Sequence, residues 1–294
     1  MMIKFRHIIH LFIAIFTDFY GLLRSLFGQV QHNQWFRNEF PFKAQANKLF
    51  VLGNGKSLSD VVDHIEMFED TDFGVVNNSI NTELFWEIKP KLYTFTDRDY
   101  HTLQREDIVA VRENILKIDW PISICIPYHY PKWFGEHCKQ NPYVTVYKYN
   151  SQPWYPELRF NQKLRMHLFK HNILAPHCTN VMVAAIFSSM LIGYKRIFIL
   201  GAEHSWMHDI RVNDKNEVVL CDRHYYGEKE RVWVDYDGMP IKITDLTESL
   251  TSTFRSYYDL EEFSQFLGDT KICNCTEGSY IDAFERLRLD HSLN

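Results

Sequence analysis

The sequence predicts an α/β fold in which a Rossmann-like parallel sheet is flanked by helices. Short apolar runs suited to buried strands recur along the chain and alternate with stretches of helical pattern. The first of these runs leads directly into a glycine turn, Gly53-Asn54-Gly55. The chain has 294 residues, of which 46% are hydrophobic and 23% charged, so it is long and apolar enough to bury the core of such a sheet.

The strands are expected at 48–52, 73–76, 91–96, 122–126, 144–149, 196–200 and 271–275. Helices are expected from Ser57 or Ser59 to about Met67, and at 179–191, 246–267 and 280–289. The carboxyl ends of parallel strands line the ligand crevice of such sheets. Asn54, Asn78 and Asp97 each follow a strand, so we expect them to converge there.

The chain divides into an N-terminal segment at 1–28, a polar linker at 29–47 and the main domain at 48–294. Within that domain, the polar and aromatic stretch at about 204–240 predicts an irregular lid with a hairpin near Asn213. The N-terminal segment has helical periodicity with an aromatic stripe made of Phe5, Ile9, Phe12, Phe16, Phe19, Leu23 and Leu26. Basic residues lie mostly off this stripe, as in a helix that lies in a membrane interface. The same stripe also fits docking on the main domain or on a second copy of the chain.

Composition excludes several classes of protein. A net charge of -5, from 32 basic and 37 acidic residues, gives no basic face for nucleic acid. The six cysteines form no Cys-x-x-Cys pair, which favours reduced thiols in a cytosolic protein. The apolar run from Leu11 to Phe16 is too short to span a bilayer, and no signal-peptide cleavage site follows it. We therefore expect a cytoplasmic protein that is peripheral on the inner face of the cell membrane.

The glycine turn does not belong to either common phosphate-binding motif. A Walker motif requires glycine where Phe50 stands, and a dinucleotide fingerprint requires glycine where Leu58 stands. What remains is a glycine turn between a strand and a helix. Free backbone N–H groups and the helix dipole there favour a phosphate, and Asn54 can bond a ribose or a phosphate.

Three segments, in order, carry a resemblance to a known family. Residues 50–58, Phe-Val-Leu-Gly-Asn-Gly-Lys-Ser-Leu, resemble the Gly-Asn-Gly-Pro-Ser-Leu opening of the bacterial sialyltransferases of glycosyltransferase family 42 and of the wider MptE-like group, which includes Maf-type nonulosonate transferases. Thr179-Asn180 opens an apolar helix that leads into Gly193–Glu203, similar to the family's second motif. His224–Glu228 is close to its His-Tyr-x-Gly-His segment. The matches extend through most of residues 48–230, with Lys56 in place of the usual proline.

The resemblance implies a GT-A-type Rossmann domain, a CMP-sugar donor, inversion at the anomeric carbon and no required metal. Asn180 matches a donor-contacting serine, and Asp97 falls where the family has asparagine. For the second strand, either Asn77 or Asn78 is the equivalent of the family's donor-binding asparagine. The residues that the resemblance places at the donor are Gly53, Asn54, Gly55, Asn77, Asn78, Asp97, Thr179, Asn180, Gly201, Tyr225 and Tyr226.

Catalysis by such an enzyme requires a base for the acceptor hydroxyl. Glu228 stands where the family has its general-base histidine, and it would need a pKa raised by burial. His224 titrates near neutral pH without such tuning, and we prefer it. Glu203, which matches an aspartate of the family, is the third catalytic candidate.

The function expected is transfer of a sialic or nonulosonic acid from a CMP-sugar to a cell-surface glycan or lipid-linked acceptor, as in lipopolysaccharide or capsule biosynthesis. Two alternatives use Asp97-Arg98-Asp99 as an Asp-x-Asp site for Mg²⁺ or Mn²⁺. One is a metal-dependent GT-A transferase with a nucleotide-diphosphate sugar, and the other is an MptE-like diphosphokinase. A nucleotide-binding protein without catalysis is the third alternative.

Overall fold

The computed structural model describes residues 47–59, 71–151, 162–224, 227–235 and 238–288. It also describes a few positions near the N-terminus, which are Phe12, Ile15, Phe16, Phe19, Tyr20 and Leu23. The expected linker at 29–47, except for Asn47, lies outside the described residues, as does the part of the first expected helix from residue 60 onward.

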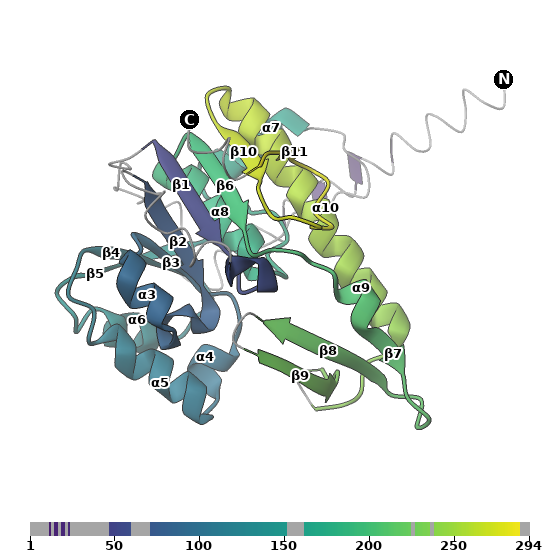
Figure 1. The fold of residues 1–294 in the computed structure, drawn as a ribbon. Helices are drawn as coiled ribbons and strands as arrows, with labels where there is room; N and C mark the ends of the chain where they lie inside the picture. Colours follow the sequence, from purple (N-terminus) through teal and green to yellow (C-terminus); the bar gives the residue numbers. More distant parts are fainter. Residues whose placement is uncertain are drawn as a thin grey trace, which may run out of the picture.

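The protein has an α/β fold built on an eight-stranded sheet, in the order β11-β10-β6-β1-β2-β3-β4-β5, in which every pair of neighbours is parallel (Figure 1). This confirms the predicted parallel sheet flanked by helices. The strands are β1 (Lys48–Leu52), β2 (Asp72–Val76), β3 (Leu92–Thr94), β4 (Ile122–Pro127), β5 (Val144–Tyr149), β6 (Arg196–Leu200), β10 (Lys271–Asn274) and β11 (Glu285–Arg286).

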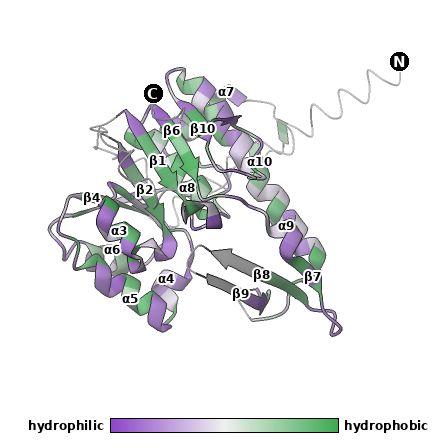
Figure 2. Cartoon of the chain, in the orientation of Figure 1, coloured by the Kyte–Doolittle hydropathy of each residue, from purple (hydrophilic) through white to green (hydrophobic). Residues whose placement is uncertain are grey.

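Helices cover both faces of the sheet, which explains why β1 and β6 are apolar after their first residue (Figure 2). Leu49 and Val51 of β1 belong to the core on one face, whereas Phe50 and Leu52 belong to the core on the other. The described helices are η1 (Lys56–Leu58), η3 (Asn77–Asn81), α3 (Glu83–Ile88), α4 (Asp99–Thr102), α5 (Glu106–Ile115), α6 (Lys132–Cys138), α7 (Gln162–Lys170), α8 (Val181–Ile192), α9 (Trp206–Asp209) and α10 (Ile243–Leu267).

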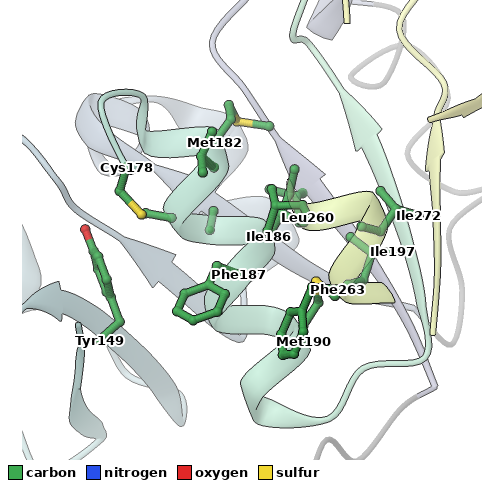
Figure 3. Packing of buried hydrophobic residues seen from close by; sticks show 14 of the residues in the cluster. Tyr149, Cys178, Met182, Ile186, Phe187, Met190, Ile197, Leu260, Phe263 and Ile272 are labelled. Atoms are coloured by element: carbon green, nitrogen blue, oxygen red, sulfur yellow. The ribbon is translucent and has the colours of Figure 1, made fainter. Parts of the chain in front are cut away.

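The apolar helix α8 is the centre of one of these two cores. Met182, Ile186 and Phe187 pack there with Phe263 of α10 and with Ile197 of β6 (Figure 3). The helix is apolar all round because it is buried all round, with nearly every residue from Met182 to Ile192 buried. It ends at Gly193, whose φ of 109° is the left-handed conformation expected of a glycine after a helix.

A small antiparallel sheet, in the order β7-β8-β9, occupies the region in which the irregular lid was expected. Its strands are β7 (Ile210–Val212), β8 (Val218–His224) and β9 (Gly227–Val232), and it lies beyond the carboxyl end of β1 and β6 (Figure 1). The predicted hairpin at Asn213 is confirmed: Asn213 N–H donates to Glu217 O over 3.0 Å. Val218 packs with Leu246 and Leu250 of α10, so the lid region has a small core of its own.

The expected helix at 280–289 is wrong over the described residues, because they are not helical and include the strand β11 beside β10. The backbone groups are satisfied by side chains: Asn274 Nδ2 donates to Ile281 O over 3.1 Å, and the Arg286 guanidinium donates to Ser279 O. Ile281 and Phe284 are both buried. The two side chains are three residues apart, as on one face of a helix, and yet both are buried here without a helix.

Candidate functional site

The order of the strands fixes where a ligand cleft is expected in this fold. From β1 the chain adds β2 to β5 on one side and then returns to place β6 on the other side of β1. The order of the sheet therefore reverses between β1 and β6, and in open parallel sheets ligands bind at this point, outside the carboxyl ends of the strands.

A cleft opens at this point, with an empty volume of about 660 Å³ including space open to solvent. The cleft is open to solvent, so a ligand can reach its lining residues from outside. Its lining comes from the turns after β1, β2 and β6 and from the start of α8, and consists of Gly53, Asn54, Gly55, Val76, Asn77, Asn180, Val181, Met182, Gly201, Ala202, Glu203, His204, Ser205, Trp206 and Asp209.

One wall of the cleft, which we call the glycine wall, consists of Gly53–Gly55 and Gly201–Glu203. The two turns approach so closely that a Cβ on Gly53 would lie 2.2 Å from Gly201 O. A Cβ on Gly55 would lie 1.5 Å from Glu203 Oε2. Gly201 itself has φ +67°, a conformation that favours glycine. The close approach of the two turns is therefore enough to explain why these positions are glycine, without a role in binding a ligand.

The amides of the glycine wall are bonded within the protein. Gly53 N–H donates to Leu200 O and Gly55 N–H to Gly201 O, each over 2.8 Å. Ser57 N–H donates to Glu203 Oε1 over 2.6 Å. These three amides are therefore not free for a phosphate, contrary to what the sequence suggested for the turn. The Glu203 carboxylate occupies the place expected for the ligand's anion.

The opposite wall, which we call the helix wall, is Asn180–Met182 at the start of α8. Asn180 is the N-cap of this helix, and its Oδ1 accepts a hydrogen bond of 2.8 Å from Met182 N–H. Asn180 thus meets Asn54 in one cleft, as the resemblance implies for two donor contacts. Thr179 is exposed and does not line the cleft; its Oγ1 lies 2.9 Å from Thr253 Oγ1.

The two asparagines after β2 have different surroundings. Asn77 lines the cleft with φ +52°, and its Oδ1 is buried without a hydrogen-bond partner. Asn78 points elsewhere: its Nδ2 donates to Asp107 and its Oδ1 accepts from Tyr100 Oη. Of the two candidates for the donor-binding asparagine, Asn77 therefore lines the cleft and Asn78 does not.

Asp97 follows β3, farther along the sheet, and does not line the cleft. Its Oδ1 accepts from the backbone N–H of Asp99 over 3.2 Å, and its carbonyl accepts from Tyr130 Oη. Burial, followed by the charge of Asp97, raises the pKa of the Asp99 carboxyl. Among the described residues, no three His, Cys, Asp or Glu side chains are grouped so as to hold a metal ion.

The predicted base candidates lie on the small antiparallel sheet. In its register His224 is opposite Gly227 and Arg223 is opposite Glu228, so His224 and Glu228 are one position apart on neighbouring strands. Their side chains lie outside the described part of the structure, as do Tyr225 and Tyr226 entirely. The assignment of the base between His224 and Glu228 stays a prediction.

His204 is a residue of the cleft to which the sequence analysis gave no role. It is 7% exposed, has φ +53°, and stacks on Trp206 with ring centroids 4.2 Å apart. Burial lowers the pKa of its imidazole to about 3, so the ring is neutral at physiological pH. The sequence feature that could have indicated His204 as a site residue is its place in the turn after β6, next to Glu203.

No protein family, curated protein sequence or solved structure matches this chain. In the described part of the chain, no helix is both long enough and apolar enough to cross a bilayer.

Proposed function

We propose that the chain is a glycosyltransferase that binds a nucleotide-activated sugar in the cleft between β1 and β6. The observation that carries this proposal is the convergence of Asn54, Asn77 and Asn180 on one cleft at the reversal point of the sheet. Amide side chains donate hydrogen bonds through their nitrogen, as binding of phosphate, ribose and sugar oxygens requires. A cleft with this position and composition is suited to a nucleotide.

In this proposal the donor phosphate lies at the helix wall and not at the glycine wall. The Glu203 carboxylate repels a phosphate, whereas the N-terminus of α8 attracts one through its dipole. Glu203 still has lone pairs beyond its bond to Ser57, and a carboxylate in this place can accept hydrogen bonds from ribose hydroxyls. The nucleoside would therefore lie toward Glu203 and the transferred sugar beyond the phosphate.

The motifs at residues 50–58, 179–203 and 224–228 support a GT-A-type enzyme similar to the sialyltransferases, with a CMP-sugar as donor. The reaction would invert the anomeric carbon and require no metal. His224 or Glu228 would take the proton of the acceptor hydroxyl as it attacks. Tyr225 and Tyr226 would hold the donor phosphate from the lid.

A membrane-bound acceptor is supported by the N-terminal segment. Phe12, Phe16 and Phe19 are helical and 68%, 72% and 57% exposed, and Ile15, Tyr20 and Leu23 are exposed as well. Their spacing of three and four residues lines them up on one face of a helix. We propose that this face lies in the inner leaflet and brings the enzyme to a lipid-linked or cell-surface glycan precursor. Pairing of two copies of the chain through this face is the competing explanation.

The test is turnover of CMP-activated nonulosonic acids, with and without Mg²⁺, by the full chain and by His224→Ala and Glu228→Gln variants. Removal of the base should lower kcat about 100-fold or more while CMP affinity changes little. Absence of this turnover, together with Mg²⁺-dependent turnover of ATP or of a nucleotide-diphosphate sugar that is lost in Asp97→Asn, would instead support the diphosphokinase or the metal-dependent transferase. CMP binding without any turnover would support a nucleotide-binding protein.

A further inference from the structure

A buried pair of side chains lies beneath the helix wall. Tyr257 of α10 is 0% exposed, and its hydroxyl contacts His204 Nε2. The same hydroxyl lies 3.5 Å from Asn180 Oδ1. His204, Tyr257 and Asn180 therefore form a chain of contacts that joins the turn after β6 and the middle of α10 to the N-cap of α8.

The direction of the hydrogen bonds in this chain follows from the protonation states. Burial raises the pKa of Tyr257 well above its usual value, so the phenol keeps its proton, and the His204 imidazole is neutral. Tyr257 has a single proton to donate. Both contacts are hydrogen bonds only if His204 Nε2–H donates to the Tyr257 oxygen and Tyr257 O–H donates to Asn180 Oδ1.

This direction decides how the Asn180 amide faces the cleft. Oδ1 already accepts from Met182 N–H, and the bond from Tyr257 uses its second lone pair. Within the described part of the chain, Asn180 Nδ2 has no hydrogen-bond partner in the protein. Asn180 thus offers two N–H donors to the cleft and has no acceptor left to offer.

The backbone at His204 gives a second reason to assign it a role. A left-handed conformation at a residue other than glycine costs energy, and such residues are found where function requires them. Here the conformation accompanies stacking on Trp206 and contact with Tyr257.

We infer that Tyr257 and His204 are positioning residues, which hold Asn180 so that its Nδ2 donates to an acceptor oxygen of the ligand at the start of α8. This rests on the proposed function, in which that oxygen belongs to the donor phosphate. The two residues do not touch the ligand in this account, and they act through Asn180.

The experiment compares Tyr257→Phe with a matched control, Tyr194→Phe. Tyr194 is also a buried tyrosine that donates to a side chain, Asp72 Oδ2 at 2.8 Å, but this bond lies at the amino end of β2 and not at the cleft. Each variant loses one buried hydroxyl and keeps its ring. Affinity for CMP is measured by titration calorimetry, and melting temperature by calorimetric scanning.

We expect both variants to melt a few degrees lower than the wild type, and only Tyr257→Phe to bind CMP about fivefold more weakly. His204→Asn, which tolerates the left-handed backbone, should also bind CMP more weakly. Wild-type CMP affinity in Tyr257→Phe, or an equal loss in Tyr194→Phe, would overturn the inference. Absence of nucleotide binding by the wild-type protein would instead remove the proposed function on which the inference rests.

Discussion

The two walls of the cleft differ in how much of their hydrogen-bonding capacity the protein itself uses. On the glycine wall, the amides of Gly53, Gly55 and Ser57 all donate within the protein, and Glu203 supplies the anion. On the helix wall, Asn180 Oδ1 is used, whereas its Nδ2 has no hydrogen-bond partner within the described part of the chain. The backbone amides of the glycine turn are therefore used within the protein, whereas Asn180 on the helix wall has a donor to offer.

This difference shows that a glycine motif can be required by packing alone. Gly53 and Gly55 stand where two turns meet at distances that no side chain tolerates, whether or not a ligand is present. A residue with a free donor in a cleft, such as Asn180, is a stronger indication of where a phosphate binds. Substitutions at Gly53, His204, Asn180 and Glu203 test this contrast.

The largest effect is expected for Gly53→Ala, because the new Cβ would lie 2.2 Å from backbone at Gly201 O. We expect a loss of about 3 kcal/mol in the free energy of unfolding, measured with urea. Gly268→Ala is the control: Gly268 has φ +79° but nothing within 4 Å of a Cβ, so its loss should be about 1 kcal/mol. Similar losses in the two variants would mean that the turns do not require glycine by contact.

The next effect concerns pH. The folded-state pKa of His204, about 3, lies below its usual value of 6.5, so the unfolded chain binds more protons between these values. Stability is then fully present above pH 6.5 and is lost as pH falls toward 3, by about 2 kcal/mol at pH 5. His177, whose pKa burial also lowers, acts in the same direction.

His204→Asn isolates the contribution of His204, because Asn fits the left-handed backbone and does not titrate. The free energy of unfolding is measured with urea for both proteins from pH 5 to pH 8. Below pH 6 it should change less steeply with pH in the variant, by an amount that corresponds to about one proton. Parallel curves would show that His204 is not a buried neutral imidazole.

Asn180→Asp tests the helix wall directly. An aspartate keeps the oxygen that caps α8 and places a negative charge at the helix N-terminus, so melting temperature should not fall. It replaces the Nδ2 donors by an acceptor, so CMP affinity should fall about tenfold, or about 1.4 kcal/mol. Unchanged CMP affinity in a stable Asn180→Asp protein would place the phosphate elsewhere.

The smallest effect is expected at Glu203. Glu203→Ala leaves Ser57 N–H without its acceptor and should cost about 1 kcal/mol of stability, whereas Glu203→Gln keeps an acceptor and should cost less. Turnover decides whether Glu203 is also catalytic. A structural role predicts a small change of kcat in Glu203→Gln, and a loss above about 100-fold would show direct participation.

The sheet was predictable because its central strands, such as β1, β4 and β6, are largely buried on both faces and therefore form short apolar runs. The boundaries of β1, β5 and β6 match the prediction, since each run ends where polar or glycine residues begin. The segment at 280–288 was not predictable in this way, because Ile281 and Phe284 satisfy a helical spacing and yet are buried in backbone that is not helical.

The site was predictable where it follows from strand ends and, for Asn180, from the start of the apolar helix. Asn54, Asn77 and Glu203 each follow a strand, and they meet in the cleft because parallel strands end at one edge of the sheet. Tyr257 lies in the middle of α10, and its contact with His204 depends on how α10 packs across the sheet. Nothing in the local sequence encodes that packing, nor the bond that closes Glu203 onto Ser57.

Binding of a nucleotide phosphate at the start of α8 can be tested by measuring the melting temperatures of the wild-type protein and of Asn180→Asp. Each protein is measured with CMP, CDP, UDP, GDP and ATP, with and without Mg²⁺. We predict that CMP without metal stabilises the wild type, by about 2.7 kcal/mol at 100 times its Kd, and stabilises Asn180→Asp less. Stabilisation only by ATP or a nucleoside diphosphate with Mg²⁺, or equal stabilisation of both proteins by CMP, would contradict the claim.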